Sequence, residues 1–195
     1  MKAVLMSIQP KWCELIASGK KTVEVRKTMP KLDVPFKVYI YCTKDKNYSF
    51  CTDDGNQYTY IGNGKVIGEF VCNNIDQYDY DYCPHPEIGM DYDCGDSWWE
   101  ISDEDLENAC LTYEEFKKYA WRHEVMYGWN ISNLVIYDKP KELSEFYHKC
   151  KSYDKDEWDI NNLDCIECEN PCGNGGKLYL KRPPQSWCYV EGGEL

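Results

Sequence analysis

The sequence has no run of 18 apolar residues, although 43% of its 195 residues are hydrophobic. A helix that crosses a membrane needs about 20 such residues, so we expect no membrane-spanning segment and no membrane partner. The opening residues MKAVLMSI are followed by Gln-Pro-Lys, before the apolar core of a signal peptide could form. The sequence therefore predicts a soluble protein that is not exported and that resides in the cytoplasm.

Histidine and basic residues are both scarce. The chain has 3 histidines, and its 22 Lys and Arg face 34 Asp and Glu, which gives a formal net charge of -12. An acidic body argues against broad non-specific DNA binding, because that affinity comes mainly from neutralising phosphates. The charge is uneven, however: residues 1–46 hold ten basic and four acidic residues, a net of +6, and the remainder holds a net of -18. A local basic site remains compatible with this composition.

Cysteine is abundant, with 12 residues. In a chain without an export signal, such a count indicates free thiols or metal ligands more often than disulfides. Cys165, Cys168 and Cys172 form a C-x2-C-x3-C cluster, and Cys188 follows sixteen residues later. These four thiolates could hold a structural zinc tetrahedrally; an iron-sulfur cluster and free thiols are the alternatives. A zinc would tie down a polar tail, and we expect no other cofactor to be required.

The apolar patterns predict an α+β fold that is rich in strands. We expect strands at residues 3–8, 22–26, 36–42, 65–75 and 128–140, helices at 10–18, 103–109 and 113–122, and a short helix or turn at 142–150. Two capping-box patterns, Ser102 with Asp105 and Thr112 with Glu115, place the starts of the second and third helices. Residues 76–99 show neither period, so we expect a long loop there. Pro140 is expected to end the last strand.

The stretch VEVR at residues 23–26 alternates apolar and charged side chains. In a strand, Val23 and Val25 would share one face, and Glu24 and Arg26 would share the other with the preceding Thr22. The charged face could be exposed to solvent, as on many edge strands, or it could line a pocket. Glu24 and Arg26 could also simply pair with each other, which is a structural role that needs no ligand.

Seven tryptophans contribute to an aromatic content of 15%. Trp98, Trp99 and Trp129 could stack on an unpaired base, as aromatic side chains do in many RNA-binding proteins. Each of them could instead pack in the core or at its rim, and the sequence leaves both roles open.

Residues 7–27, SIQPKWCELIASGKKTVEVRK, resemble the opening of ASCH domains, which are members of the PUA-like superfamily. Their signature is Gly-x-Lys-x-x-Glu-x-Arg, and Gly19, Lys21, Glu24 and Arg26 occupy its positions here. The segment GWNISNLVIYDKPKEL is similar to the last barrel strand of phage-associated bacterial members. The resemblance implies a PUA-like small β-barrel with helices at its ends, formed by residues 1–150. Residues 151–195 would then be a cysteine-rich extension that packs on the barrel.

The resemblance also implies a cleft near the first helix, lined by Lys21, Thr22, Glu24 and Arg26, that takes RNA, a nucleoside or a nucleotide. Arg26 and Lys21 could contact a phosphate or a base acceptor, the former as a planar fork and the latter as a point charge. Glu24 could accept a hydrogen bond from an exocyclic amine. We therefore expect a module that binds RNA or a modified nucleoside.

Some relatives are amidohydrolases that act on N4-acetylcytidine nucleosides with a lysine, a threonine nucleophile and a glutamate. Lys21 matches their lysine, and Glu107 in the run ENACLT matches their glutamate. The threonine position falls on Glu24, and a carboxylate cannot replace an activated hydroxyl; Thr22 lies one pleat repeat earlier.

The alternative function is thus a hydrolase of a nucleoside or of RNA. Lys21 would be its proton shuttle or electrostatic stabiliser and Glu24 its general base. A third hypothesis is an interaction module whose acidic surface binds a basic protein.

Overall fold

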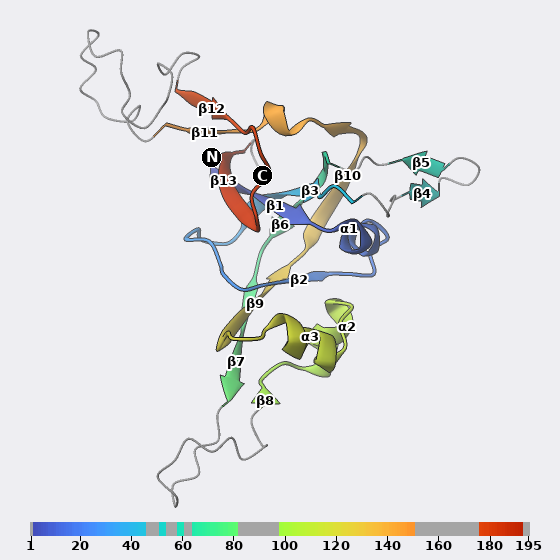
Figure 1. Ribbon diagram of the computed structural model, residues 1–195, viewed down its shortest axis with the longest axis vertical. Coiled ribbons are helices and arrows are strands. Elements are labelled where there is room, and N and C mark those ends of the chain that lie inside the picture. Colours follow the sequence, from blue (N-terminus) through green and yellow to red (C-terminus); the bar gives the residue numbers. More distant parts are fainter. Residues whose placement is uncertain are drawn as a thin grey trace, which may run out of the picture. The chain divides into compact units, whose positions relative to one another are not determined.

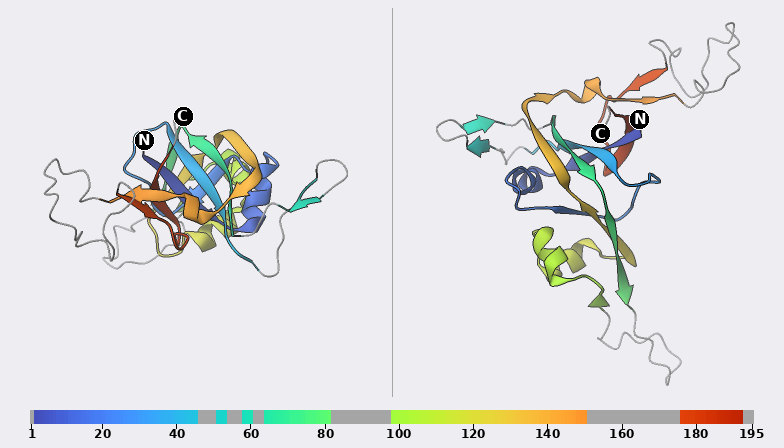
Figure 2. Two further views of the ribbon diagram at one scale, coloured as in Figure 1. Left: turned by 90° about the horizontal axis from the view of Figure 1, so that it is seen from above. Right: turned by 180° about the vertical axis from the view of Figure 1, so that it is seen from behind.

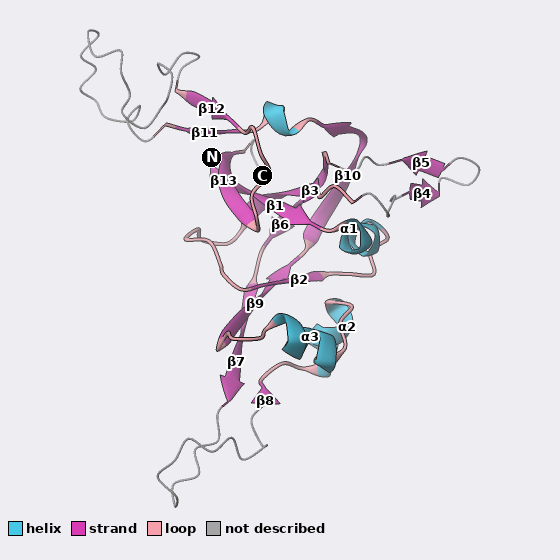
Figure 3. Cartoon of the chain, in the orientation of Figure 1, coloured by secondary structure: helices cyan, strands magenta, loops and turns pink. Residues whose placement is uncertain are grey.

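The computed structural model describes residues 2–45, 51–53, 58–60, 64–81, 98–150 and 176–192. The chain divides into two compact units. The first unit comprises Met1–Glu14, Phe36–Phe70 and Leu134–Leu195, and the second comprises Leu15–Pro35 and Val71–Asn133. The described residues are mostly strands with few helices, as Figure 3 shows, which confirms the expected abundance of strands. Among the described residues, no helix combines the length and the apolar character needed to cross a membrane.

A five-stranded sheet with the order β10-β6-β3-β1-β13 forms the centre of the first unit. Its strands are β1 (Lys2–Ile8), β3 (Phe36–Cys42), β6 (Val66–Cys72), β10 (Ser132–Lys141) and β13 (Trp187–Glu191). Strand β1 pairs in parallel with β3 and antiparallel with β13, beside which it lies in Figure 1. Every residue of β1 after Lys2 is buried. This burial of both faces explains why the sequence shows a continuous apolar run there.

Shorter elements complete the first unit. They are the start of helix α1 (Pro10–Ala17), the hairpin of β4 (Cys51–Asp53) with β5 (Tyr58–Tyr60), the 3-10 helix η1 (Leu143–Glu145), and the pair β11 (Tyr147–Lys149) with β12 (Lys177–Tyr179). Figure 2 shows β11 and β12 side by side. The apolar core of this unit includes Leu5 and the edge-on ring pair of Tyr39 and Phe146, whose centroids lie 4.9 Å apart.

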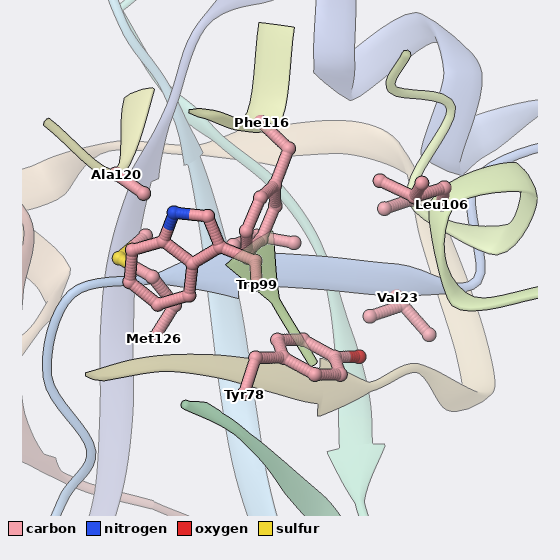
Figure 4. Close-up of a cluster of buried hydrophobic side chains, with 9 residues drawn as sticks. Val23, Tyr78, Trp99, Leu106, Phe116, Ala120 and Met126 are labelled. Carbon is pink, nitrogen blue, oxygen red and sulfur yellow. The ribbon is translucent and has the colours of Figure 1, made fainter. Parts of the chain in front are cut away.

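The second unit contains a four-stranded sheet with the order β2-β9-β7-β8. Its elements are β2 (Val23–Arg26), β7 (Ile75–Asp81), β8 (Trp98–Trp99), β9 (Val125–Asn130), and the helices α2 (Asp103–Asn108) and α3 (Tyr113–Tyr119). Side chains from strands and helices meet in one apolar cluster (Figure 4). Phe116 of α3 lies at the centre of this cluster. Its ring packs edge-on against the rings of Tyr78 and Trp99, with centroid distances of 5.9 Å and 5.4 Å.

The capping signals at the two helices of this unit are confirmed. Ser102 accepts a hydrogen bond from the Asp105 amide, 3.0 Å away, at the start of α2. At α3 the capping box is complete: Thr112 accepts from the Glu115 amide, and the Glu115 carboxylate accepts from the Thr112 amide at 3.0 Å. These bonds satisfy backbone donors that a helix start leaves open.

Replacing Thr112 with alanine is therefore expected to lower the free energy of unfolding by about 1 kcal/mol, because the side-chain half of the capping box is lost. Urea unfolding followed by circular dichroism measures this change. Thr112→Ser keeps the hydroxyl and should remain close to the wild-type value. Equal stability of the alanine variant and the wild type would contradict the role of the cap.

Three sequence predictions about strands were wrong. The expected loop at 76–99 contains most of β7 and all of β8, and residues 82–97 lie outside the described part. The expected strand at 65–75 is β6, which ends at Cys72, and Ile75 already belongs to β7. The strand expected at 128–140 is instead β9 and β10, separated at Ile131.

Pro140 does not end β10, which runs to Lys141. Strand β10 is an edge strand of its sheet, and an edge position tolerates the missing N–H of proline. The third helix, expected to reach 122, ends at Tyr119.

The predicted closed barrel is wrong for the described residues, whereas the predicted separate C-terminal extension stays a prediction. Among the described residues, β10 and β13 are the two edges of the five-stranded sheet and are not paired with each other, so the sheet is open. The predicted boundary at residue 150 stays a prediction. Strand β13, which lies beyond that boundary, is nevertheless a partner of β1.

Candidate functional site

Both faces of β2 are buried. Val23 and Val25 are 3% and 5% exposed and belong to the apolar cluster of the second unit. Glu24 and Arg26, on the opposite face, are 6% and 8% exposed. A solvent-exposed charged face, one of the alternatives left open by the sequence, is therefore wrong.

The turn after α1 brings Lys21 to the start of β2. Gly19 has a φ of +72°, a left-handed conformation that glycine adopts without strain. The amides of Lys20 and Lys21 both donate to the carbonyl of Leu15 at 3.0 Å. The helix thus ends in a tight turn, and the Lys21 side chain, 3% exposed, enters the interior of the second unit.

Three signature side chains form one buried ion-pair network, which we call the charged cluster: Lys21, Glu24 and Arg26. One oxygen of the Glu24 carboxylate, Oε2, lies 3.4 Å from Lys21 Nζ, and the other, Oε1, lies 3.0 Å from Arg26 Nη2. Lys21 Nζ also donates to the carbonyl oxygen of Ala109 at 2.7 Å. A single buried carboxylate is therefore shared by two buried cations. In such surroundings the free energy of each charged group depends on the presence of its partners.

The end of α2 and the residues after it lie along residues 20–22. The Thr22 amide donates to the Asn108 carbonyl at 2.9 Å, and the Cys110 thiol donates to the Lys20 carbonyl at 3.4 Å. The run ENACLT therefore adjoins the signature lysine. The Glu107 side chain itself is exposed, and Thr22 is half-buried.

Sequence reasoning missed two neighbours of the charged cluster, the Ala109 carbonyl and Tyr119. Partial burial raises the pKa of Tyr119; the Arg26 guanidinium opposes this rise and the Glu24 carboxylate adds to it. Lys27 Nζ lies 5.1 Å from the centre of the Tyr119 ring. Every residue has a carbonyl, so no sequence signal marks Ala109, and Tyr119 is one of 17 tyrosines.

Of the four cysteines considered as zinc ligands, Cys165, Cys168 and Cys172 lie outside the described residues. Cys188 is half-buried in β13, and burial raises the pKa of its thiol to about 11. Within the described ranges, no group of three or more His, Cys, Asp or Glu side chains is placed to hold a metal ion.

The three tryptophans considered for base stacking differ in exposure. Trp129 is fully buried, and Trp99 is 5% exposed within the apolar cluster of the second unit. Trp98 is 48% exposed. Core packing therefore describes the first two, and only Trp98 presents much of its indole to solvent.

Comparisons with known proteins agree with the signature at 19–26. The family model described as ASCH domain matches residues 6–171. Two crystal structures of ASCH from Zymomonas mobilis are similar in fold, each at 17% sequence identity. For a mutant form the TM-score is 0.52, and the match covers 98% of this chain and 91% of the chain in that structure. For a second structure the TM-score is 0.51, and the match covers 97% of this chain and 87% of the chain in that structure. No curated protein was found to match the sequence.

Proposed function

Because the chain belongs to the ASCH domain family, we propose that it binds RNA or a modified nucleoside through the charged cluster. The observation that carries this proposal is the burial of three signature ions, each less than 10% exposed, in one network. Taking ions out of water costs several kcal/mol per ion, and apolar side chains of similar volume often stabilise a fold as well or better. A role in recognition explains why charges stand at these positions.

The donors and acceptors of the charged cluster suit a nucleobase or a phosphate. Lys21 and Arg26 supply only donors, with the guanidinium as a planar fork, and Glu24 supplies only acceptors. Hydrogen bonds to charged groups are stronger where water is excluded. The edge of a cytosine, which carries acceptors beside an exocyclic amine, could engage both kinds of group.

One observation favours hydrolysis as a second candidate function. The segment that contains Glu107 is hydrogen-bonded to residues 20–22, so the lysine and the glutamate that match the amidohydrolases lie on adjoining segments. Lys21 would then stabilise developing negative charge, and Glu24 or Glu107 would move a proton. The carboxylate of Glu24 stands where those enzymes have a hydroxyl nucleophile, and for this reason we prefer binding to turnover.

Titration of the full-length protein against nucleosides, modified cytidines and short single-stranded RNAs tests the proposal. Lys21→Met should weaken binding by about 10- to 100-fold, because it removes a charged hydrogen-bond donor. Lys20→Met is the matched control: Lys20 is the exposed neighbour, so wild-type affinity is expected. Circular dichroism checks that both variants are folded.

Mass spectrometry of each mixture then separates the candidate functions. Ligand recovered unchanged supports a binding module, whereas a converted ligand supports the hydrolase. Equal affinity of Lys21→Met and the wild type would refute a role for the charged cluster. Binding to none of these ligands would favour the third hypothesis, an interaction module for a basic protein.

A further inference from the structure

A groove of about 710 Å³ lies in the second unit, and the charged cluster does not line it. The residues that matter for its chemistry are Tyr80, Trp99, Lys117, Trp121, Arg122 and His123. They come from the end of β7, from β8, from α3 and from the turn between α3 and β9. The groove therefore combines three aromatic side chains with two cations and a histidine.

The turn at 120–124 presents Trp121 to solvent. The His123 amide donates to the Ala120 carbonyl at 2.9 Å, and the Tyr80 amide donates to the Glu124 carbonyl at 2.8 Å. Between these bonds Arg122 has a φ of 65°, a left-handed conformation that costs a non-glycine residue about 1–2 kcal/mol. Trp121, which lies in this turn, is 72% exposed, the most exposed of the large hydrophobic side chains in the described residues.

Two aromatic residues of the groove lining, Tyr80 and Trp99, pack against each other and against the core. The rings of Tyr80 and Trp99 are tilted against each other with centroids 5.3 Å apart. Trp99 also packs edge-on against Phe116, and Figure 4 shows it among Phe116, Ala120 and Met126. The same groove is lined by the exposed indole of Trp121 and by the cations Lys117 and Arg122. Aromatic faces stack on unpaired bases, and a guanidinium or ammonium contacts phosphates.

We propose that this groove is a second binding site, which stacks an unpaired base of single-stranded RNA on Trp121 and holds its phosphates with Arg122 and Lys117. The proposal rests on the proposed function, because it takes RNA as the ligand class. Charge complementarity favours RNA over a basic partner: the chain carries a net charge of -12, yet the described residues that line the groove include two cations, Lys117 and Arg122, and one acidic residue, Glu124. In double-stranded RNA the bases are paired and stacked within the helix, so they could not stack on the indole.

Tyr119 connects this groove with the charged cluster along the chain. Its hydroxyl interacts electrostatically with Arg26 and Glu24, and it immediately precedes the groove residues at 120–124. A strand that occupies both sites contacts more of the protein than a nucleoside does. We therefore expect an oligoribonucleotide to bind more tightly than its component nucleosides.

Two variants of the full-length protein test the groove with a labelled single-stranded RNA of about ten nucleotides, in the range of single-strand site sizes. Trp121→Ala should weaken RNA binding by about 5- to 100-fold, which corresponds to the loss of one base stack. Arg122→Gly should weaken it and reduce its salt dependence. Glycine suits the positive φ of this position, so the change introduces no backbone strain, and circular dichroism checks that both variants are folded.

The matched controls are Trp98→Ala, which removes an exposed indole that does not line the groove, and Lys118→Ala, which removes an exposed cation beside Lys117. Both should retain wild-type affinity for RNA. Cytidine binding, measured by calorimetry, should be unchanged in Trp121→Ala and Arg122→Gly, because a nucleoside uses the charged cluster.

Wild-type RNA affinity in both groove variants would overturn this proposal, even if Lys21→Met lost binding and the proposed function stood. A wild-type protein that binds cytidine but not the RNA would also overturn it. Loss of RNA binding in the groove variants alone, with Lys21→Met unaffected, would support the groove and refute the charged cluster as the RNA site.

Discussion

Glu24→Gln is expected to lower the free energy of unfolding by about 3–5 kcal/mol, the cost of removing one partner from a buried ion pair. Glu24 is the only anion among the three charges, and it is shared by Lys21 at 3.4 Å and Arg26 at 3.0 Å. The variant removes the carboxylate charge that both buried cations share. Urea unfolding followed by circular dichroism measures the loss, with the m-value as a check that unfolding exposes the same surface.

Glu107→Gln is the matched control, because it makes the same chemical change at an exposed position of α2. Its free energy of unfolding should stay within about 0.5 kcal/mol of the wild type. Adding Lys21→Met to Glu24→Gln completes a double-mutant cycle that isolates the pairwise energy. Equal stabilities of Glu24→Gln and Glu107→Gln would show that the charged cluster is hydrated and would remove the main support for the proposed function.

Phe116→Ala should be comparably destabilising, by about 3–5 kcal/mol, because truncating a fully buried phenylalanine loses apolar contact and leaves a cavity. It also removes the edge-on contacts with Tyr78 and Trp99, and such pairs contribute about 0.5–1.5 kcal/mol beyond burial. Thermal or urea unfolding measures the effect. Lys118→Ala, on the exposed side of the same helix, should change stability by less than about 0.5 kcal/mol. A loss below about 1 kcal/mol in Phe116→Ala would contradict the central place of this ring.

Elements with strong local signals could be predicted from the sequence. The apolar run of β1, the alternation in β2 and the capping residues of α2 and α3 are all properties of neighbouring residues. Strand β7, with the sequence IDQYDYD, has no such signal. Only Tyr78 of this strand is buried, and the strand is defined by its pairing with β9 and β8. Pairing with distant strands therefore overrode its polar composition.

The sequence by itself determined the members of the charged cluster, since Lys21, Glu24 and Arg26 follow a short motif at fixed spacing. Only the tertiary structure decided that both faces of β2 are buried and that Lys21 meets the carbonyl of Ala109, 88 residues away along the chain. It also decided that residues 120–124 line one groove together with Tyr80 and Trp99. The physical reason is that a motif specifies which groups are present, whereas burial and backbone contacts depend on segments that are brought together only by folding.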